Sequence, residues 1–179
     1  MYPAKVMTAG EGGFIVTNNK KLRDKLLMIR NHGMLKGYDT RLLGLNLRLP
    51  EINAAIATVQ MKKLPKFLKT REKNAKLLSK LLSKSNLDLP LERKNENVNW
   101  YLYTVSTPKR NMLLKKLNAK GIGAASYYPI PVHKTPFYKS KTKLPITDWA
   151  ASNVLSLPIH PKVTTKNIEF IAKTVLEVL

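Results

Sequence analysis

The chain has 179 residues, enough for one domain or two small ones, and 44% of them are hydrophobic while 24% are charged. This composition is that of a globular protein and excludes a wholly disordered chain. Because the sequence contains no cysteine, disulfide scaffolds, zinc–thiolate sites and thiol nucleophiles are excluded as well.

The charge is strongly basic, since 32 lysines and arginines stand against 11 acidic residues and give a formal net charge of +21. Clustered cations would favour nucleic acid, but these are spread along the whole chain without a helix-turn-helix, zinc-finger or aromatic RNA-binding motif. A solvated lysine-rich surface is therefore favoured over nucleic-acid binding. No apolar run approaches the ~20 residues of a membrane helix and the start lacks a signal-peptide core, so we expect a cytoplasmic protein.

The first 49 residues are predicted to hold one strand, one helix and a loop. The run GFIVT at 13–17 has the composition of a strand, and apolar residues at helical spacing predict a helix over Lys20–Arg30. Residues 36–49 are glycine-rich and irregular, which predicts a loop. One strand and one helix cannot enclose a core, so we expect a partner chain or lost sequence to cover this segment.

Two helical runs are predicted in the middle of the chain. Pro50 suits the first turn of a helix, because its missing N–H has no partner there. Pro65 is predicted to break or kink this helix, since it removes a backbone donor and clashes with the preceding turn. A second helical run follows to about Ser83.

The last part is predicted to be a small α/β unit. Residues 98–106 are aromatic and β-branched on both faces, which predicts a strand buried on both sides. A helix that ends near Gly121 follows, and then a second strand from Ile122 toward Tyr128, which would complete a right-handed crossover. Beyond a loop over 129–146, helices are predicted from Asp148 to Leu155 and from about Thr165.

The segment around Lys5 carries the most chemical information. Three glycines, at positions 10, 12 and 13, follow Lys5 closely and allow tight turns and a close backbone approach to a ligand. A desolvated lysine beside such a turn can act as a nucleophile and form a Schiff base. Taken alone the signal is weak, because most lysines and most glycine-rich turns are structural.

The segment MYPAKVMTAGEGGFIVTN resembles the active-site segment of the DegT/DnrJ/EryC1/StrS sugar aminotransferases, which are pyridoxal-phosphate (PLP) enzymes of the aspartate aminotransferase fold, fold type I. Further similar motifs occur in the family's order and at its spacing over nearly the whole chain: Arg30–Gly33, Gly44–Leu49, Glu51–Ala55, Trp100–Tyr103, Tyr128–His133 and Leu155–Pro161. The resemblance implies an α/β chain in three parts. These are a remnant of the large PLP-binding domain over 1–49, linking helices over 50–84 and a small C-terminal α/β domain over 85–179.

The resemblance also implies roles for four residues. Lys5 matches the catalytic lysine that holds the cofactor, and Asn46 matches a residue that reaches across a dimer interface to the partner's cofactor phosphate. Arg48 lies in the same motif and is expected to assist there, while His133 matches a histidine near the sugar substrate or the amino donor. His32 and His160 are expected to be structural, and we expect no metal site.

The largest departure from the family lies before Lys5, where four residues replace the long PLP-binding portion with its acidic partner of the pyridine nitrogen and its stacking aromatic ring. We therefore expect a truncated or split aminotransferase that, when complete, moves an amino group from glutamate or glutamine to a nucleotide-linked keto sugar. Alone the chain is expected to be inactive and to bind PLP poorly. The alternative is a non-catalytic dimerisation or partner module that complements a separately encoded N-terminal half; nucleic-acid binding ranks third.

Overall fold

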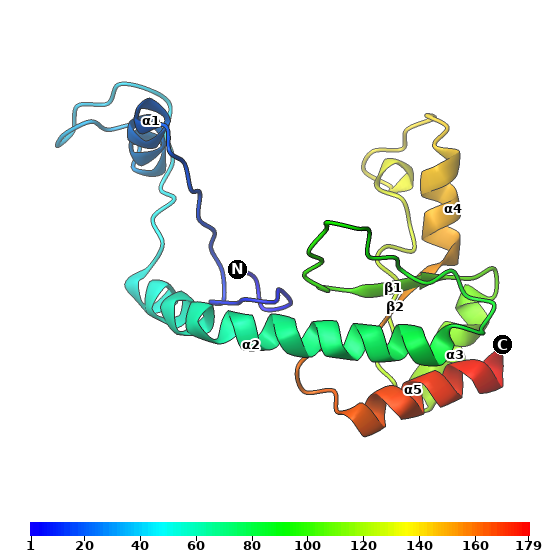
Figure 1. Ribbon diagram of the computed structural model, residues 1–179. Coiled ribbons are helices and arrows are strands. Elements are labelled where there is room, and N and C mark those ends of the chain that lie inside the picture. The colour runs from blue at the N-terminus through cyan, green and yellow to red at the C-terminus, as the bar shows by residue number, and fades with distance from the viewer. The chain divides into compact units, whose positions relative to one another are not determined.

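The structure, a computed structural model, describes residues 1–179 and divides into two units, Met1–Pro65 and Lys66–Leu179 (Figure 1). None of its helices combines the length and the apolar character that a membrane span requires. The elements, in chain order, are α1 (Lys20–Arg30), α2 (Glu51–Leu82), β1 (Tyr103–Ser106), α3 (Arg110–Ala119), the 3-10 helix η1 (Val132–Lys134), α4 (Pro145–Asn153), β2 (Val154–Leu157) and α5 (Thr165–Val178).

Helix α1 of the first unit confirms the helix predicted over Lys20–Arg30. Its N-cap is Asn19, whose side-chain oxygen accepts a hydrogen bond from the Leu22 backbone N–H at 3.0 Å and so satisfies one of the free donors of the first turn. The predicted loop over 36–49 is confirmed too, since it contains only isolated bridges.

The strand predicted at 13–17 does not form. A strand needs a neighbouring strand to satisfy its backbone N–H and C=O groups, and none lies beside this run. Ile15 and Val16 are 71% and 85% exposed. Their β-branched side chains gave this run the composition of a strand, but they pack against no core in this unit.

The first unit has almost no core. Ala9 is its only buried hydrophobic residue, whereas large apolar side chains along the loops, α1 and the start of α2 are exposed. The expectation that this part of the chain does not enclose a core of its own is therefore confirmed. Apolar surface of this extent is typical of a surface that another polypeptide covers.

Helix α2 runs without interruption from Glu51 to Leu82, so of the break or kink predicted at Pro65 the break does not occur. Proline removes one backbone hydrogen bond, but the bonds of the neighbouring turns can carry a long helix past it. The division between the two units falls directly after Pro65. The C-terminal half of α2 packs through Leu78 and Leu82, which are fully buried.

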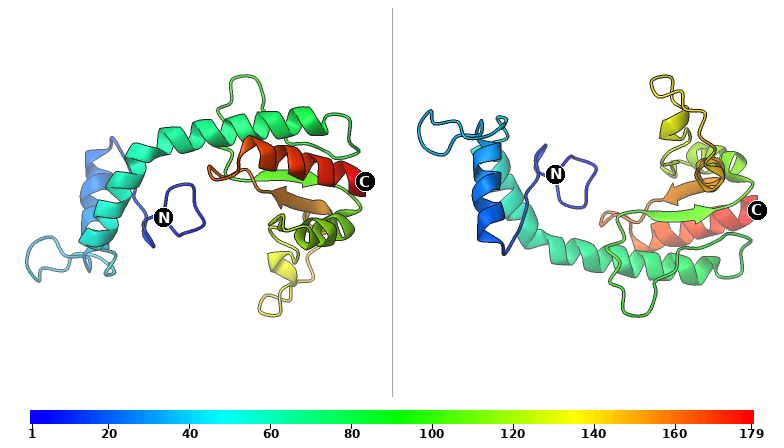
Figure 2. Two further views of the ribbon diagram at one scale, coloured as in Figure 1. Left: turned by 90° about the horizontal axis from the view of Figure 1, so that it is seen from below. Right: turned by 90° about the horizontal axis from the view of Figure 1, so that it is seen from above.

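The core of the second unit forms where α2, α3 and α5 pack with the two-stranded sheet. In Figure 2, α5 lies beside the C-terminal half of α2. Strands β1 and β2 pair antiparallel, with Tyr103 opposite Leu157 and Ser106 opposite Val154. The largest fully buried side chains are Tyr103, Leu78, Leu82, Leu113, Leu117, Leu155, Ile168, Val105 and Val175.

The predicted crossover from residues 98–106 to 122–128 is wrong. The partner of β1 is β2, which immediately follows α4, and the pair is antiparallel rather than parallel. The segment after Gly121 contributes one bridge only, from Ala125 to Ser156, so it lines the sheet edge without forming a strand. The helix predicted to reach Leu155 ends at Asn153, because the last residues of that run belong to β2.

Helix α5 confirms the predicted start at Thr165. Thr164 and Asn167 form a capping box, in which the Thr164 hydroxyl accepts from the Asn167 N–H and the Asn167 side chain accepts from the Thr164 N–H at 2.9 Å. Ile168, Ile171 and Val175 then recur on one buried face at helical spacing. The apolar stripe predicted from the sequence is therefore the face that packs into the core.

His160, between β2 and α5, is expected to make the second unit less stable at acid pH. Partial burial lowers the pKa of His160, and the positive charge of Arg71 lowers it further. The unfolded chain then binds a proton at His160 more readily than the folded chain does. The free energy of unfolding is therefore highest above about pH 6.5 and decreases as the pH falls below that value. We expect His160→Gln to flatten this dependence in urea titrations at about pH 7.5 and 5.5.

Fluorescence reports this transition, because both tryptophans, Trp100 and Trp149, lie in the second unit. His32→Gln, in the first unit, is the matched control and is expected to keep the dependence of the wild type. An unchanged dependence in His160→Gln would contradict the prediction.

Candidate functional site

The Lys5 loop is a closed turn at the start of the chain. The Lys5 N–H donates to the Tyr2 carbonyl, and the Ala9 N–H returns to the Met1 carbonyl, both at 3.0 Å. The Thr8 hydroxyl also donates to the Met1 carbonyl, at 3.0 Å. Gly10 has φ +85°, a backbone conformation that glycine adopts without strain. Gly12 has φ +116°, so these two glycines of the motif serve the turn itself.

Helix α2 anchors this loop through one side chain. The Asn53 amide, in the first turn of α2, donates to the Ala9 carbonyl at 2.6 Å. A Cβ added to Gly10 would lie 3.3 Å from that amide, so the close approach also favours glycine. The Lys5 side chain lies at the exposed surface of the loop.

Asn46 and Arg48 are brought together beside the C-terminal end of α1. Asn46 bridges to Asn31, and the Arg48 guanidinium donates from Nη1 to the Asn31 side-chain oxygen at 2.6 Å. Gly33 permits the close approach of the preceding part of this loop, because it has φ +73° and a Cβ there would lie 1.7 Å from the Leu42 carbonyl oxygen. Both side chains are exposed, which leaves an amide and a guanidinium available to an anion.

A cofactor pocket is not complete in the first unit. Lys5, Asn46 and Arg48 are all exposed, and Lys5 comes from a different segment than the other two. A hollow in this unit is lined mainly by apolar side chains, among them Met7, Phe14 and Leu49. Lys62 and Thr58 are its polar lining residues, and Lys5, Asn46 and Arg48 do not line it, so this hollow by itself does not fit a phosphorylated cofactor bound to these three residues.

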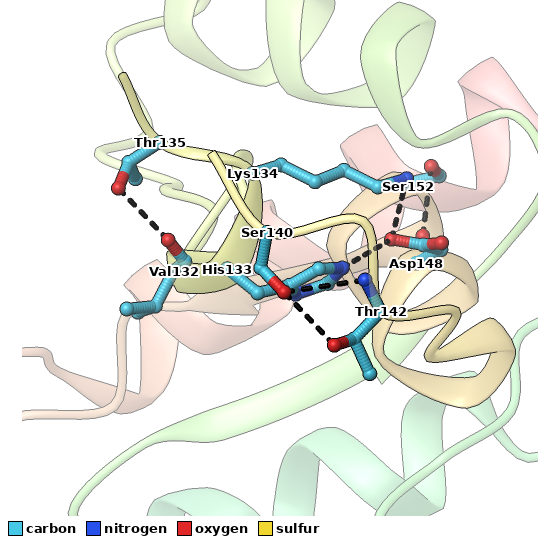
Figure 3. Close-up of polar contacts among 8 residues, drawn as sticks. All are labelled: Val132, His133, Lys134, Thr135, Ser140, Thr142, Asp148 and Ser152. Atoms are coloured by element: carbon cyan, nitrogen blue, oxygen red, sulfur yellow. Dashed lines mark hydrogen bonds and ion pairs between the residues drawn. The ribbon is translucent and has the colours of Figure 1, made fainter. Parts of the chain in front are cut away.

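His133 lies in the second unit, in η1, and its side chain is 11% exposed. Its Nε2 is 3.7 Å from Oδ1 of Asp148, and the Lys134 ammonium is 2.7 Å from the same oxygen (Figure 3). Asp148 lies in the first turn of α4, which begins with a proline. Sequence reasoning missed Asp148 and Lys134 as neighbours of His133, although the proline and the acidic first turn are a helix-start signal that marks this aspartate.

Comparison with known proteins identifies the family. The model of the DegT/DnrJ/EryC1/StrS aminotransferase family matches residues 1–176. The chain belongs to this family. Its members are PLP-dependent aminotransferases, so the resemblance seen in the sequence is confirmed.

Two curated relatives show how much of a family member the chain represents. It is 33% identical to a pleiotropic regulatory protein of Geobacillus stearothermophilus, over 98% of this chain and 50% of the relative. It is 35% identical to the dTDP-3-amino-3,4,6-trideoxy-alpha-D-glucose transaminase of Streptomyces venezuelae, over 89% of this chain and 44% of that enzyme. The chain thus spans about half the length of these relatives.

Solved structures of the family show the same fold. The structure superposes on an aminotransferase of this family from Brucella abortus with a TM-score of 0.91 and 28% identity, covering 98% of this chain and 48% of the other. It superposes on S. venezuelae DesV, solved with a ketimine intermediate, with a TM-score of 0.90 and 31% identity, covering 98% and 49%. The expected fold class, the C-terminal portion of a fold-type I PLP-dependent transferase, is confirmed.

Proposed function

We propose that the chain acts as the C-terminal half of a PLP-dependent aminotransferase that transfers an amino group from glutamate or glutamine to a nucleotide-linked keto sugar. Residues 1–49 would belong to the large domain, 50–84 would link the domains, and 85–179 would form the small domain. The observation that carries the proposal is the family match over 1–176 together with relatives named as dTDP-sugar and UDP-sugar aminotransferases.

Within this proposal Lys5 would hold the cofactor, and Asn46 and Arg48 would contact the phosphate of a cofactor held by a partner subunit. The bound cofactor would supply an electron sink for the carbon that loses or gains the amino group. The exposed amide and guanidinium beside α1 support the second assignment, because both donate hydrogen bonds and the guanidinium suits a phosphate. His133 is proposed to contact the sugar or the amino donor.

A second candidate function is a non-catalytic partner module. The exposed apolar side chains of Met1–Pro65 favour it, since a surface of this kind is stabilised when another polypeptide covers it. Both candidates require a partner. The partner is either a second identical subunit in a homodimer or a separate chain that supplies the N-terminal half of the family fold. In the first candidate this chain supplies the catalytic lysine, whereas in the second it serves as the module on which the separately encoded half docks.

The test is complementation. The purified chain is titrated with PLP, alone and after mixing with the N-terminal half of the S. venezuelae relative, and the absorbance of lysine-bound cofactor is recorded. We expect a saturable band and transaminase activity from the mixture only. A mixture that assembles without either would favour the partner module, and a saturable band from the chain alone would contradict the need for a second half.

A further inference from the structure

Two buried polar atoms of the second unit face one another without a hydrogen bond. Nε2 of His133 and Oδ1 of Asp148 are both buried and lie 3.7 Å apart; Nε2 has no hydrogen-bond partner, whereas Oδ1 is in an ion pair with Lys134. Buried polar groups in folded proteins nearly always have partners, because leaving one unsatisfied costs about 1–3 kcal/mol. A donor and an acceptor at this separation can satisfy each other after a movement of under about 1 Å.

Lys134 is a second neighbour of the Asp148 carboxylate. Its ammonium lies 2.7 Å from Oδ1 of Asp148 and forms an ion pair with it, but a carboxylate oxygen has more than one lone pair and can accept from the imidazole as well. The Lys134 side chain is 50% exposed, whereas that of His133 is 11% exposed. Water partly screens the lysine end of this ion pair, whereas the contact to the imidazole is shielded from water. The lysine leaves the aspartate able to accept from the imidazole.

Both residues are held in place from outside the pair. Arg110, which is buried, donates from Nε to the Ser152 carbonyl at 3.0 Å and from Nη2 to the Ala151 carbonyl at 2.6 Å. These bonds fix the C-terminal end of α4, the helix that carries Asp148. On the other side, the Ser140 N–H donates to the His133 carbonyl at 2.8 Å and fixes the backbone of η1.

We propose that Asp148 is the positioning residue of His133: its carboxylate accepts a hydrogen bond from Nε2–H and thereby fixes the ring orientation and the tautomer. The other ring nitrogen, Nδ1, is then left as the acceptor that His133 presents to a hydroxyl or ammonium group. A carboxylate that holds one nitrogen of an imidazole sets which nitrogen carries the proton and what the free nitrogen can do. The substrate role of His133 rests on the proposed function, whereas the pairing rests on the structure alone.

The test is nitrogen NMR of the full chain with labelled histidine, at about pH 8.5, above the range in which histidines ordinarily take up protons. The chain has 3 histidines, so His32 and His160 serve as internal references in the same spectrum. We expect a resonance from an Nε2 proton of His133 that exchanges slowly with water. It should persist in Asp148→Glu and in Lys134→Gln, and disappear in Asp148→Ala.

The proposal is overturned if the wild type lacks the protected proton, or if Asp148→Ala retains it. Unchanged His160 signals establish that Asp148→Ala is folded. If that variant is unfolded, the test rests on the wild type and Asp148→Glu, and absence of the protected proton from either of them overturns the proposal. UDP-N-acetylglucosamine is then added to the wild type. Absence of any shift at His133 counts against its substrate role, while the Asp148-dependent proton decides the pairing independently.

Discussion

Replacing Lys5 by alanine is expected to abolish transamination and the band of lysine-bound cofactor in the complemented enzyme. The lysine supplies the only amine of the glycine-rich loop, and no other side chain between Tyr2 and Gly13 can form a Schiff base. The resemblance to the family also implies that Lys5 moves the proton during transamination, and the loss of this general base alone should lower the rate by about 10²- to 10⁴-fold. Steady-state rates and the cofactor spectrum of the variant, mixed with the N-terminal half, measure both effects.

Lys20→Ala is the matched control for this experiment. Lys20 is also an exposed lysine of the first unit, but it begins α1 and lies outside the glycine-rich loop. We expect the control to keep the band and the activity of the wild type. A Lys5→Ala mixture with an undiminished band would show that another amine binds the cofactor and would remove Lys5 from the site.

Replacing Leu78 by alanine is expected to lower the free energy of unfolding of the second unit by about 2–5 kcal/mol. Leu78 is fully buried in the core, where α2 packs against the sheet and α5. Truncation removes apolar contacts and leaves a cavity that its neighbours fill only in part. Urea unfolding followed by the fluorescence of Trp100, which is also buried in this core, measures the change.

Leu91→Ala removes the same atoms at the surface. Leu91 belongs to the second unit and is 86% exposed, so its replacement should change the free energy of unfolding by less than about 0.5 kcal/mol. Equal losses in the two variants would contradict the assignment of Leu78 to the core.

The local elements of this protein could be predicted from short stretches of sequence. Helix α1 follows from apolar residues at helical spacing and a capping asparagine, and α5 follows from its apolar stripe after Thr164. The family was accessible for a similar reason, because its motifs are contiguous runs such as the one around Lys5. Information of this kind lies within a few residues, so no knowledge of the fold is needed to find it.

Pairings between distant segments could not be predicted in this way. Residues 13–17 and 122–128 have the composition of strands, yet neither forms one, while Val154–Leu157 pairs with β1. A strand exists only where another strand can satisfy its backbone, and composition carries no record of which segment will lie beside it. The continuity of α2 at Pro65 could not be predicted locally either, because the hydrogen bonds of the neighbouring turns keep the helix intact there.

The sequence by itself determined the family, the candidate lysine and the helices α1 and α5, together with the lack of a core in the first part of the chain. Tertiary structure alone decided the antiparallel sheet and the neighbours of His133. Asp148 is fifteen positions away along the chain, beyond a proline- and lysine-rich loop, and it lies 3.7 Å from the imidazole only because η1 and α4 are fixed against each other. Contacts of this kind depend on how a loop closes, which local propensity does not specify.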